Sequence, residues 1–143
     1  MSPDALDRTI LVVVGASLRA EEMDRPLGYR LADEIKRRLG DGSDWSPLVI
    51  SDVLYVNDKS LACCPVISLG GPGVNHLSSL LFRELPSVLS IDNVLILQMD
   101  VDLVDHRCCL WGMDHDQTVE ALDLFIKRGH LDYFLNGVTA AKA

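Results

Sequence analysis

The chain has 143 residues, of which 48% are hydrophobic, and its 21 acidic and 13 basic residues give a formal net charge of −8. A chain of this size buries roughly two thirds of its unfolded surface, so we expect one domain over residues 1–143 without a linker. The negative charge repels phosphate backbones and anionic lipid surfaces, which disfavours nucleic acid and membranes as partners.

The sequence shows no signal for export or for membrane insertion. No positively charged leader with an apolar core precedes Ile10, and no apolar run reaches the roughly 18 residues of a spanning helix. The four cysteines form two adjacent pairs, Cys63 with Cys64 and Cys108 with Cys109, which fits neither a CxxC motif nor a secreted disulfide framework. We therefore expect a cytoplasmic protein with buried, reduced thiols.

The first predicted elements are a strand, a turn and a helix. The apolar run at residues 10–14 is typical of a strand that is covered on both faces, and it stops at Gly15. Asp24 can cap a helix with Pro26 near its first turn, in which apolar residues recur at positions 27, 31, 35 and 39 until Gly40. The turn after the strand is expected at the carboxyl edge of a parallel sheet, where α/β proteins place their sites.

The middle of the chain predicts two further strands and a helix. Residues 48–50 and 53–56 are interpreted as one strand with a possible break between them, and residues 65–69 as the next strand. The glycine-rich turn at residues 70–75 leads into a helix with leucines at positions 77, 80, 81 and 85. This is a second strand, loop and helix unit.

The last third of the chain continues the alternation of strands and helices. Residues 94–97 are predicted as a buried strand and residues 108–111 as a short edge strand. Asp114 with Gln117 resembles a capping box, opening a helix that Gly129 ends, and the tail 139–143 is expected to fray. The whole pattern predicts a three-layer α/β/α domain with a mostly parallel sheet.

Side chains that could carry chemistry follow several of these strands. Glu22 and His115 could bind a divalent cation such as nickel or zinc if their loops meet, and Asp100 follows a buried strand that could end at the same edge. Histidines at such positions also serve as surface or capping residues. The glycine-rich turn could receive an anion or a carbonyl oxygen on its backbone, or be only a tight turn capped by Asn75.

Four landmarks resemble the hydrogenase maturation endopeptidases. Residues 15–22 (GASLRAEE) are similar to the Gly–Asn–x–Leu–x–x–Asp–Asp/Glu opening of that family, and residues 69–73 resemble its Asp–Gly–Gly–Thr-like turn. The strand at residues 94–97 matches a further strand of the pattern. Residues 115–122 are similar to its His–x–x–x–Leu–x–Glu–Ala–Leu helix. The resemblance extends from residue 10 to about residue 125.

This resemblance implies a hydrogenase maturation protease-like domain that removes a C-terminal peptide from a partner protein, using nickel that the substrate carries. By position, Glu22 and His115 keep the catalytic and metal-binding chemistry. The family has a carboxylate where this chain has Leu69 and an asparagine where it has Ala16, so either Asp100 replaces the missing ligand or the metal site has been lost. The turn would form part of the substrate-binding wall, with Gly70, Gly71, Gly73 and Asn75.

Three functions remain open from the sequence. The first is metal-assisted cleavage of a peptide from a partner protein, with water as the attacking group. The second is a non-catalytic peptide-binding or assembly module of the same fold, suggested by Leu69 and Ala16. The third is a nucleotide- or phosphate-binding domain. The turn at residues 70–75 contains no basic residue, which disfavours this function.

Overall fold

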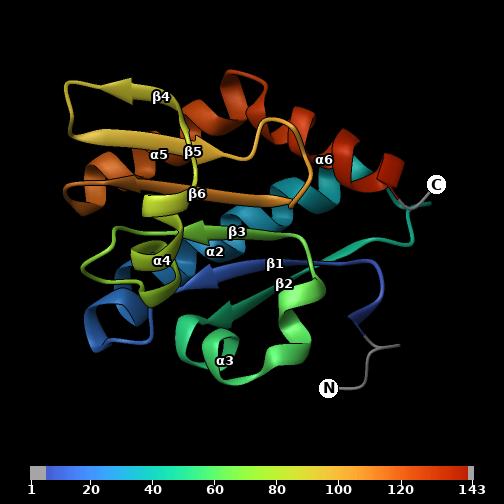
Figure 1. The fold of residues 1–143 in the computed structure, drawn as a ribbon, viewed down its shortest axis with the longest axis horizontal. Helices are drawn as coiled ribbons and strands as arrows, with labels where there is room; N and C mark the ends of the chain where they lie inside the picture. The colour runs from blue at the N-terminus through green and yellow to red at the C-terminus, as the bar shows by residue number, and fades with distance from the viewer. Residues whose placement is uncertain (1–5, 142–143) are drawn as a thin grey trace.

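A twisted sheet runs through the middle of the molecule, with helices on both of its faces (Figure 1). The computed structural model describes residues 6–141, which contain six strands, five α-helices and one 3-10 helix. The strands are β1 (Thr9–Val14), β2 (Ser46–Ser51), β3 (Val66–Leu69), β4 (Ser87–Ile91), β5 (Leu95–Met99) and β6 (Arg107–Gly112). The helices are α2 (Leu18–Leu39), α3 (Asp52–Asn57), the 3-10 helix η1 (Lys59–Cys63), α4 (His76–Glu84), α5 (His115–Lys127) and α6 (His130–Ala141).

The strand order is β2-β1-β3-β6-β5-β4, and the first four strands in this order run parallel. β5 is antiparallel to β6, and β4 pairs antiparallel with β5 at the edge of the sheet. The turn between β4 and β5 contains Asp92 and Asn93 at positive φ, a pair that suits a tight hairpin. The prediction of an α/β fold with a mostly parallel sheet is therefore confirmed.

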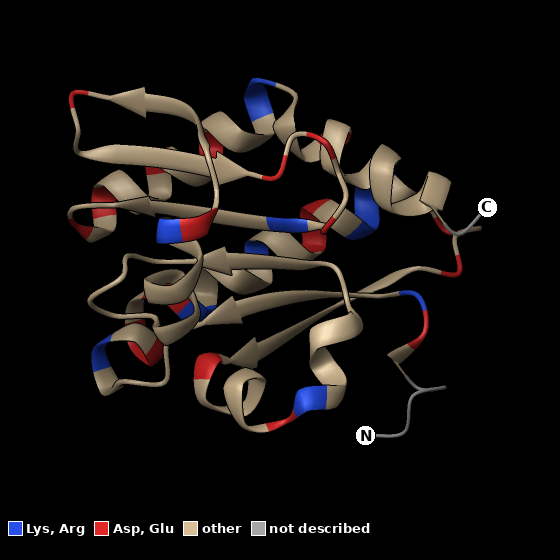
Figure 2. Ribbon diagram, viewed as in Figure 1, with Lys and Arg blue, Asp and Glu red and all other residues tan. Residues whose placement is uncertain are grey.

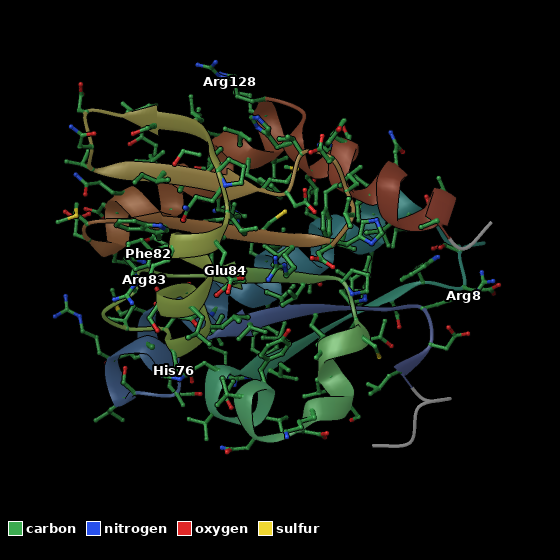
Figure 3. The ribbon with its side chains drawn as sticks, viewed as in Figure 1. Arg8, His76, Phe82, Arg83, Glu84 and Arg128 are labelled. Atoms are coloured by element: carbon green, nitrogen blue, oxygen red, sulfur yellow. The ribbon has the colours of Figure 1, made fainter. Side chains whose placement is uncertain are left out.

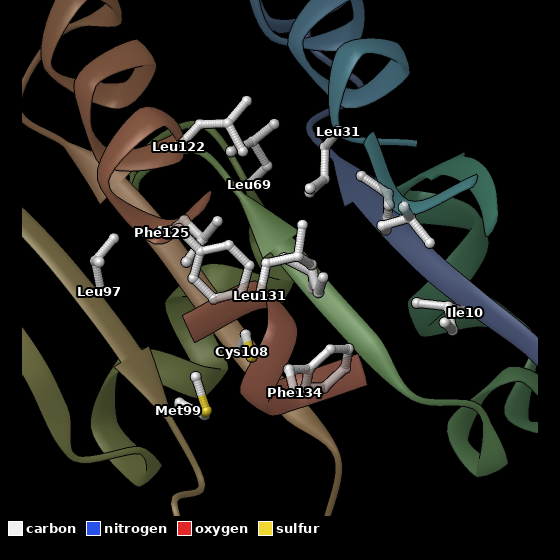
Figure 4. Packing of buried hydrophobic residues seen from close by; sticks show 14 of the residues in the cluster. Ile10, Leu31, Leu69, Leu97, Met99, Cys108, Leu122, Phe125, Leu131 and Phe134 are labelled. Atoms are coloured by element: carbon white, nitrogen blue, oxygen red, sulfur yellow. The ribbon is translucent and has the colours of Figure 1, made fainter. Parts of the chain in front are cut away.

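Two apolar layers hold the helices to the sheet. On one face, α2, α5 and α6 pack through residues such as Leu31, Phe125 and Phe134, as Figure 4 shows. On the other face, η1 and α4 pack through Leu61 and Leu77. Alternate residues of β1 enter opposite layers, because side chains alternate along a strand. This explains why the run at residues 10–14 is apolar throughout, as a strand buried on both faces requires.

Helix α2 begins earlier than the sequence predicted. Ser17 is its N-cap, and the Ser17 hydroxyl accepts a hydrogen bond from the Ala20 amide at 3.2 Å. Asp24 and Pro26 consequently lie inside the helix, so the prediction of Asp24 as the cap is wrong. Gly28 lies where an added Cβ would be 3.1 Å from the Val14 side chain, which lets α2 pack closely on β1. The early start carries Asp24 onto the buried side of the helix.

Two other predicted strands differ in the structure. Residues 53–56 belong to helix α3 rather than to a strand, because Ser51 caps that helix by accepting a hydrogen bond from the Leu54 amide at 3.1 Å. The predicted edge strand at residues 108–111 is β6, which lies inside the sheet between β3 and β5. The edge beyond β5 is formed by β4, a strand that the sequence pattern did not predict.

The C-terminal end also differs from the prediction. Helix α6 continues to Ala141, so the first part of the tail expected to fray is helical, while residues 142–143 lie outside the described residues. None of the helices within residues 6–141 combines the length and apolar character needed to cross a membrane. Lysine and arginine are scattered over separate elements in the view of Figure 2 rather than gathered in one patch.

Candidate functional site

A pocket of about 460 Å³ opens at the carboxyl edge of the sheet. Its walls come from the first turns of α2, the glycine-rich turn after β3, and the junction between β6 and α5. The chain leaves β1 for α2 on one face of the sheet, whereas it leaves the adjacent strand β3 for α4 on the other face. The pocket therefore lies beside a topological switch point, the usual place for a ligand in an open α/β sheet.

A carboxylate and an imidazole meet in the wall of this pocket. Asp24 comes from the second turn of α2, and His115 is the first residue of α5. The Asp24 Oδ1 atom lies 3.6 Å from the His115 Nδ1 atom, slightly beyond hydrogen-bonding distance. That nitrogen is buried and has no hydrogen-bond partner in the described part of the chain. A small rotation of either side chain would join the two groups.

The surroundings of Asp24 oppose the ionisation of its carboxyl group. Only 7% of the residue is exposed, and this burial raises the pKa of its carboxyl group, while His115 and Arg19 act to lower it. A buried carboxyl group with a raised pKa beside an imidazole in a cleft is typical of a functional site. The pair can hold or move a proton between the two side chains.

The glycine-rich turn passes directly beside this pair. Gly70 has a φ of +109°, and an added Cβ there would lie 3.0 Å from the Asp24 Oδ2 atom. A side chain at Gly70 would therefore be strained and would crowd the carboxylate. Gly71 and Gly73 line the pocket, and their backbone amides donate to no acceptor within residues 6–141. The turn thus offers free backbone donors to a ligand.

Asn75 has a different place from the one predicted for a substrate-binding residue. It is 1% exposed, and its side-chain amide donates to the carbonyl oxygens of Val13 and Leu69. Its side-chain oxygen accepts from the Ser78 amide as the N-cap of α4, as the alternative interpretation of the turn predicted. Asn75 therefore fastens the turn to β1 and β3.

The structure does not bring Glu22 or Asp100 to His115. Glu22 is exposed and lies outside the pocket wall, roughly 200° around the helix axis from Asp24. Asp100 follows β5, and because β5 runs antiparallel to β6 it lies at the opposite edge of the sheet. There Asp100 accepts hydrogen bonds from the backbone amides of Asp102 and Asp105.

Within residues 6–141, no three His, Cys, Asp or Glu side chains lie together as a metal site requires. The position before the glycines is Leu69, a core residue with no exposed surface. Asp24 and His115 alone could act on a metal only if a substrate supplied the other ligands.

Sequence reasoning missed Asp52 as well as Asp24. Asp52 is 6% exposed and accepts hydrogen bonds from the amides of Ala16, Val53 and His76, at 3.0, 2.8 and 2.7 Å. It therefore joins the loops after β1, β2 and β3 beside a second hollow of about 270 Å³. The signal for Asp52 was its position directly after a strand. The signal for Asp24 was its spacing of three residues from Leu27, which places both on the buried side of the helix.

No protein-family model matches this chain, and no curated protein or solved structure matches it either. The geometry of the pocket is therefore the basis for assigning a function.

Proposed function

We propose that this protein binds a peptide segment of a partner protein in the pocket and cleaves it there, as a peptidase-like protein similar to the hydrogenase maturation endopeptidases. The observation that carries this proposal is the buried Asp24 carboxyl group 3.6 Å from the imidazole of His115, in the wall of a pocket at the carboxyl edge of the sheet. The pair replaces the predicted combination of Glu22 and His115.

The lining of the pocket supports a peptide as the ligand. Apolar side chains provide much of its wall, among them those of Met23, Val74, Trp111 and Met113. The amides of Gly71 and Gly73 can donate to the carbonyl oxygens of a peptide backbone. A mixture of apolar contacts and a few placed polar groups is typical of a ligand site.

The pair can assist the attack of water on a peptide carbonyl. His115 takes a proton from the water molecule while the water oxygen bonds to the carbonyl carbon of the peptide. The imidazolium that forms is stabilised by the Asp24 carboxylate. The same proton then passes to the amide nitrogen as the carbon–nitrogen bond breaks. The pair thus acts first as a base and then as an acid.

A metal carried by the substrate fits the same two side chains. Two ligands of a tetrahedral ion at about 2.1 Å stand roughly 3.4 Å apart, close to the observed separation of 3.6 Å. Such an ion would polarise the peptide carbonyl, with its remaining ligands coming from the partner protein.

A non-catalytic peptide-binding module is the second candidate. It is favoured by the small donor set, because within residues 6–141 no third metal-ligating side chain joins Asp24 and His115. In this case the partner would be held in the same pocket and released uncut.

Comparison of partner fragments separates the two candidates. Tagged wild-type protein, Asp24→Asn and His115→Ala would each be incubated with an extract of the source cells, and peptide termini would be identified by mass spectrometry. We expect the wild type to produce new peptide termini. Both variants should produce them at a rate lower by about 100-fold or more.

Glu22→Gln and Asp116→Asn serve as controls, because both side chains are exposed and neither lines the pocket. They should cleave at the wild-type rate. A full-length partner recovered equally with every variant would support the binding module, and new termini that persist in His115→Ala would exclude the pair from the reaction.

A further inference from the structure

Arg19 lies in the wall of the pocket and has no ion-pair partner within residues 6–141. Most other arginines do have one, although acidic residues outnumber basic ones by 21 to 13 and offer many partners. The paired arginines are Arg8, Arg25, Arg30, Arg37, Arg38 and Arg107.

Helix stability does not explain a cation at this position. Arg19 is the second residue of α2, where the helix dipole is positive and favours acidic side chains. The N-cap bond is made by Ser17, so Arg19 does not satisfy the free amides of the first turn. A positive charge in the first turn of α2 is unfavourable for the helix, so the position of Arg19 is better explained by a role in the pocket.

Two acidic side chains line the pocket, and within residues 6–141 neither forms an ion pair with Arg19. Asp24 is close enough for the Arg19 charge to lower its pKa, but no ion pair joins the two side chains within residues 6–141. Asp114 also lines the pocket, and its side chain already accepts the cap bond of α5 from the Gln117 amide at 2.9 Å. Arg19 is therefore the cation left available to an incoming anion.

We propose that Arg19 binds a carboxylate of the peptide that occupies the pocket, which makes peptides with an acidic group the preferred ligands. This inference rests on the proposed function, since it specifies the ligand of the same pocket. The carboxylate can be the free C-terminus of the peptide or an acidic side chain, because both present the same pair of oxygens to a guanidinium group.

Three small peptides distinguish these sources. N-acetyl-Leu-Leu has a free C-terminal carboxylate, its amide has none, and N-acetyl-Leu-Glu amide has only a side-chain carboxylate. Each would be titrated into the full chain, and affinity would be measured by NMR from the shifts of the pocket amides and of the Trp111 indole. We expect at least one carboxylate peptide to bind roughly three- to tenfold more tightly than the uncharged amide.

Two variants test the assignment to Arg19. In Arg19→Gln the preference for the carboxylate should disappear, while binding of the uncharged amide should stay unchanged. Arg83→Gln is the matched control, because Arg83 is exposed on α4, stacks over Phe82 and lies outside the pocket wall (Figure 3). It should keep the wild-type preference.

The outcomes separate this inference from the function on which it rests. Equal affinity for the three peptides, or a preference that survives in Arg19→Gln, would overturn the role of Arg19 and leave peptide binding in place. Absence of pocket shifts with all three peptides would contradict both peptide binding and the role of Arg19.

Discussion

Asp24 is a buried carboxyl group whose surroundings oppose its ionisation. Burial raises its pKa above the ordinary value, so the folded protein holds this proton at pH values where the unfolded chain has lost it. Stability therefore falls as the pH rises from the unfolded to the folded pKa, and the penalty is complete above that window. A residue that costs stability in this way is typical of a site maintained for function.

The substitution Asp24→Asn should remove this penalty. We expect it to raise the melting temperature at pH 7, where the carboxyl group of the unfolded wild-type chain is ionised, and to leave it unchanged near pH 3, where this group is largely protonated in both states. Thermal unfolding followed by circular dichroism between pH 3 and pH 8 measures the difference.

Asp116→Asn is the control for this experiment, since Asp116 is exposed in the first turn of α5. It should lower stability at pH 7 by up to about 1 kcal/mol, opposite in sign to Asp24→Asn, because a negative charge is lost at the positive end of the helix dipole. A lower melting temperature for Asp24→Asn at pH 7 would mean that the contact with His115 outweighs the cost of burial.

Among the elements around the site, the loop after β1 and the turn after β3 pack against each other at Gly15. An added Cβ at this position would lie 1.9 Å from the Val74 carbonyl oxygen and 2.9 Å from the Ala20 side chain. Because the nearest atom belongs to the backbone, the two loops would have to separate. Gly15→Ala should therefore lower the free energy of unfolding by about 2–3 kcal/mol, as measured by urea denaturation.

Gly42→Ala provides the comparison, because an added Cβ at Gly42 meets no atom within 4 Å. This variant should match the wild type or be slightly more stable, since alanine restricts the unfolded chain. Equal stability of both alanine variants would show that the loops at Gly15 separate easily.

Local sequence patterns correctly predicted the elements whose formation depends on nearby residues. The apolar runs gave β1 and β3, and the cap residues Asn75 and Asp114 gave the starts of α4 and α5. The failures arose where two local signals competed. At α2, Ser17 accepts the cap bond from the Ala20 amide, so the helix begins before Asp24. At α3, the cap at Ser51 outweighed the strand preference of the residues after it.

Over the whole molecule, strand direction decided which side chains share an edge. His115 was placed correctly at the carboxyl edge, because β6 is parallel to β3 and β1. Asp100 was expected there too, but the reversal at β5 places it at the opposite edge. Periodicity indicates which residues are buried but not which way a strand runs. The sequence therefore indicated that His115 and the glycine-rich turn follow strands, but it could not indicate that Asp24 lies beside His115.

The two helical layers also set the accessibility of the thiols. Cys108 and Cys109 are adjacent on β6, and their side chains enter opposite apolar layers, so both are fully buried. Burial raises the pKa of Cys109 to about 11 and raises the pKa of Cys108 well above its ordinary value. Cys64 is buried as well, whereas Cys63 is exposed in η1, which corrects the prediction that all four thiols are buried.

The rate at which the thiols react with a reagent such as dithionitrobenzoate therefore tests whether the helices on both faces stay packed against the sheet. None of the four cysteines forms a disulfide in the described part of the chain, so at pH 8 we expect one thiol to react rapidly in the native protein and four to react in denaturant. Cys63→Ser should abolish the rapid reaction and leave the slow ones unchanged. Rapid modification of Cys108 or Cys109 would instead mean that a helical layer opens readily from the sheet, because a buried thiol can react only when its cover moves away.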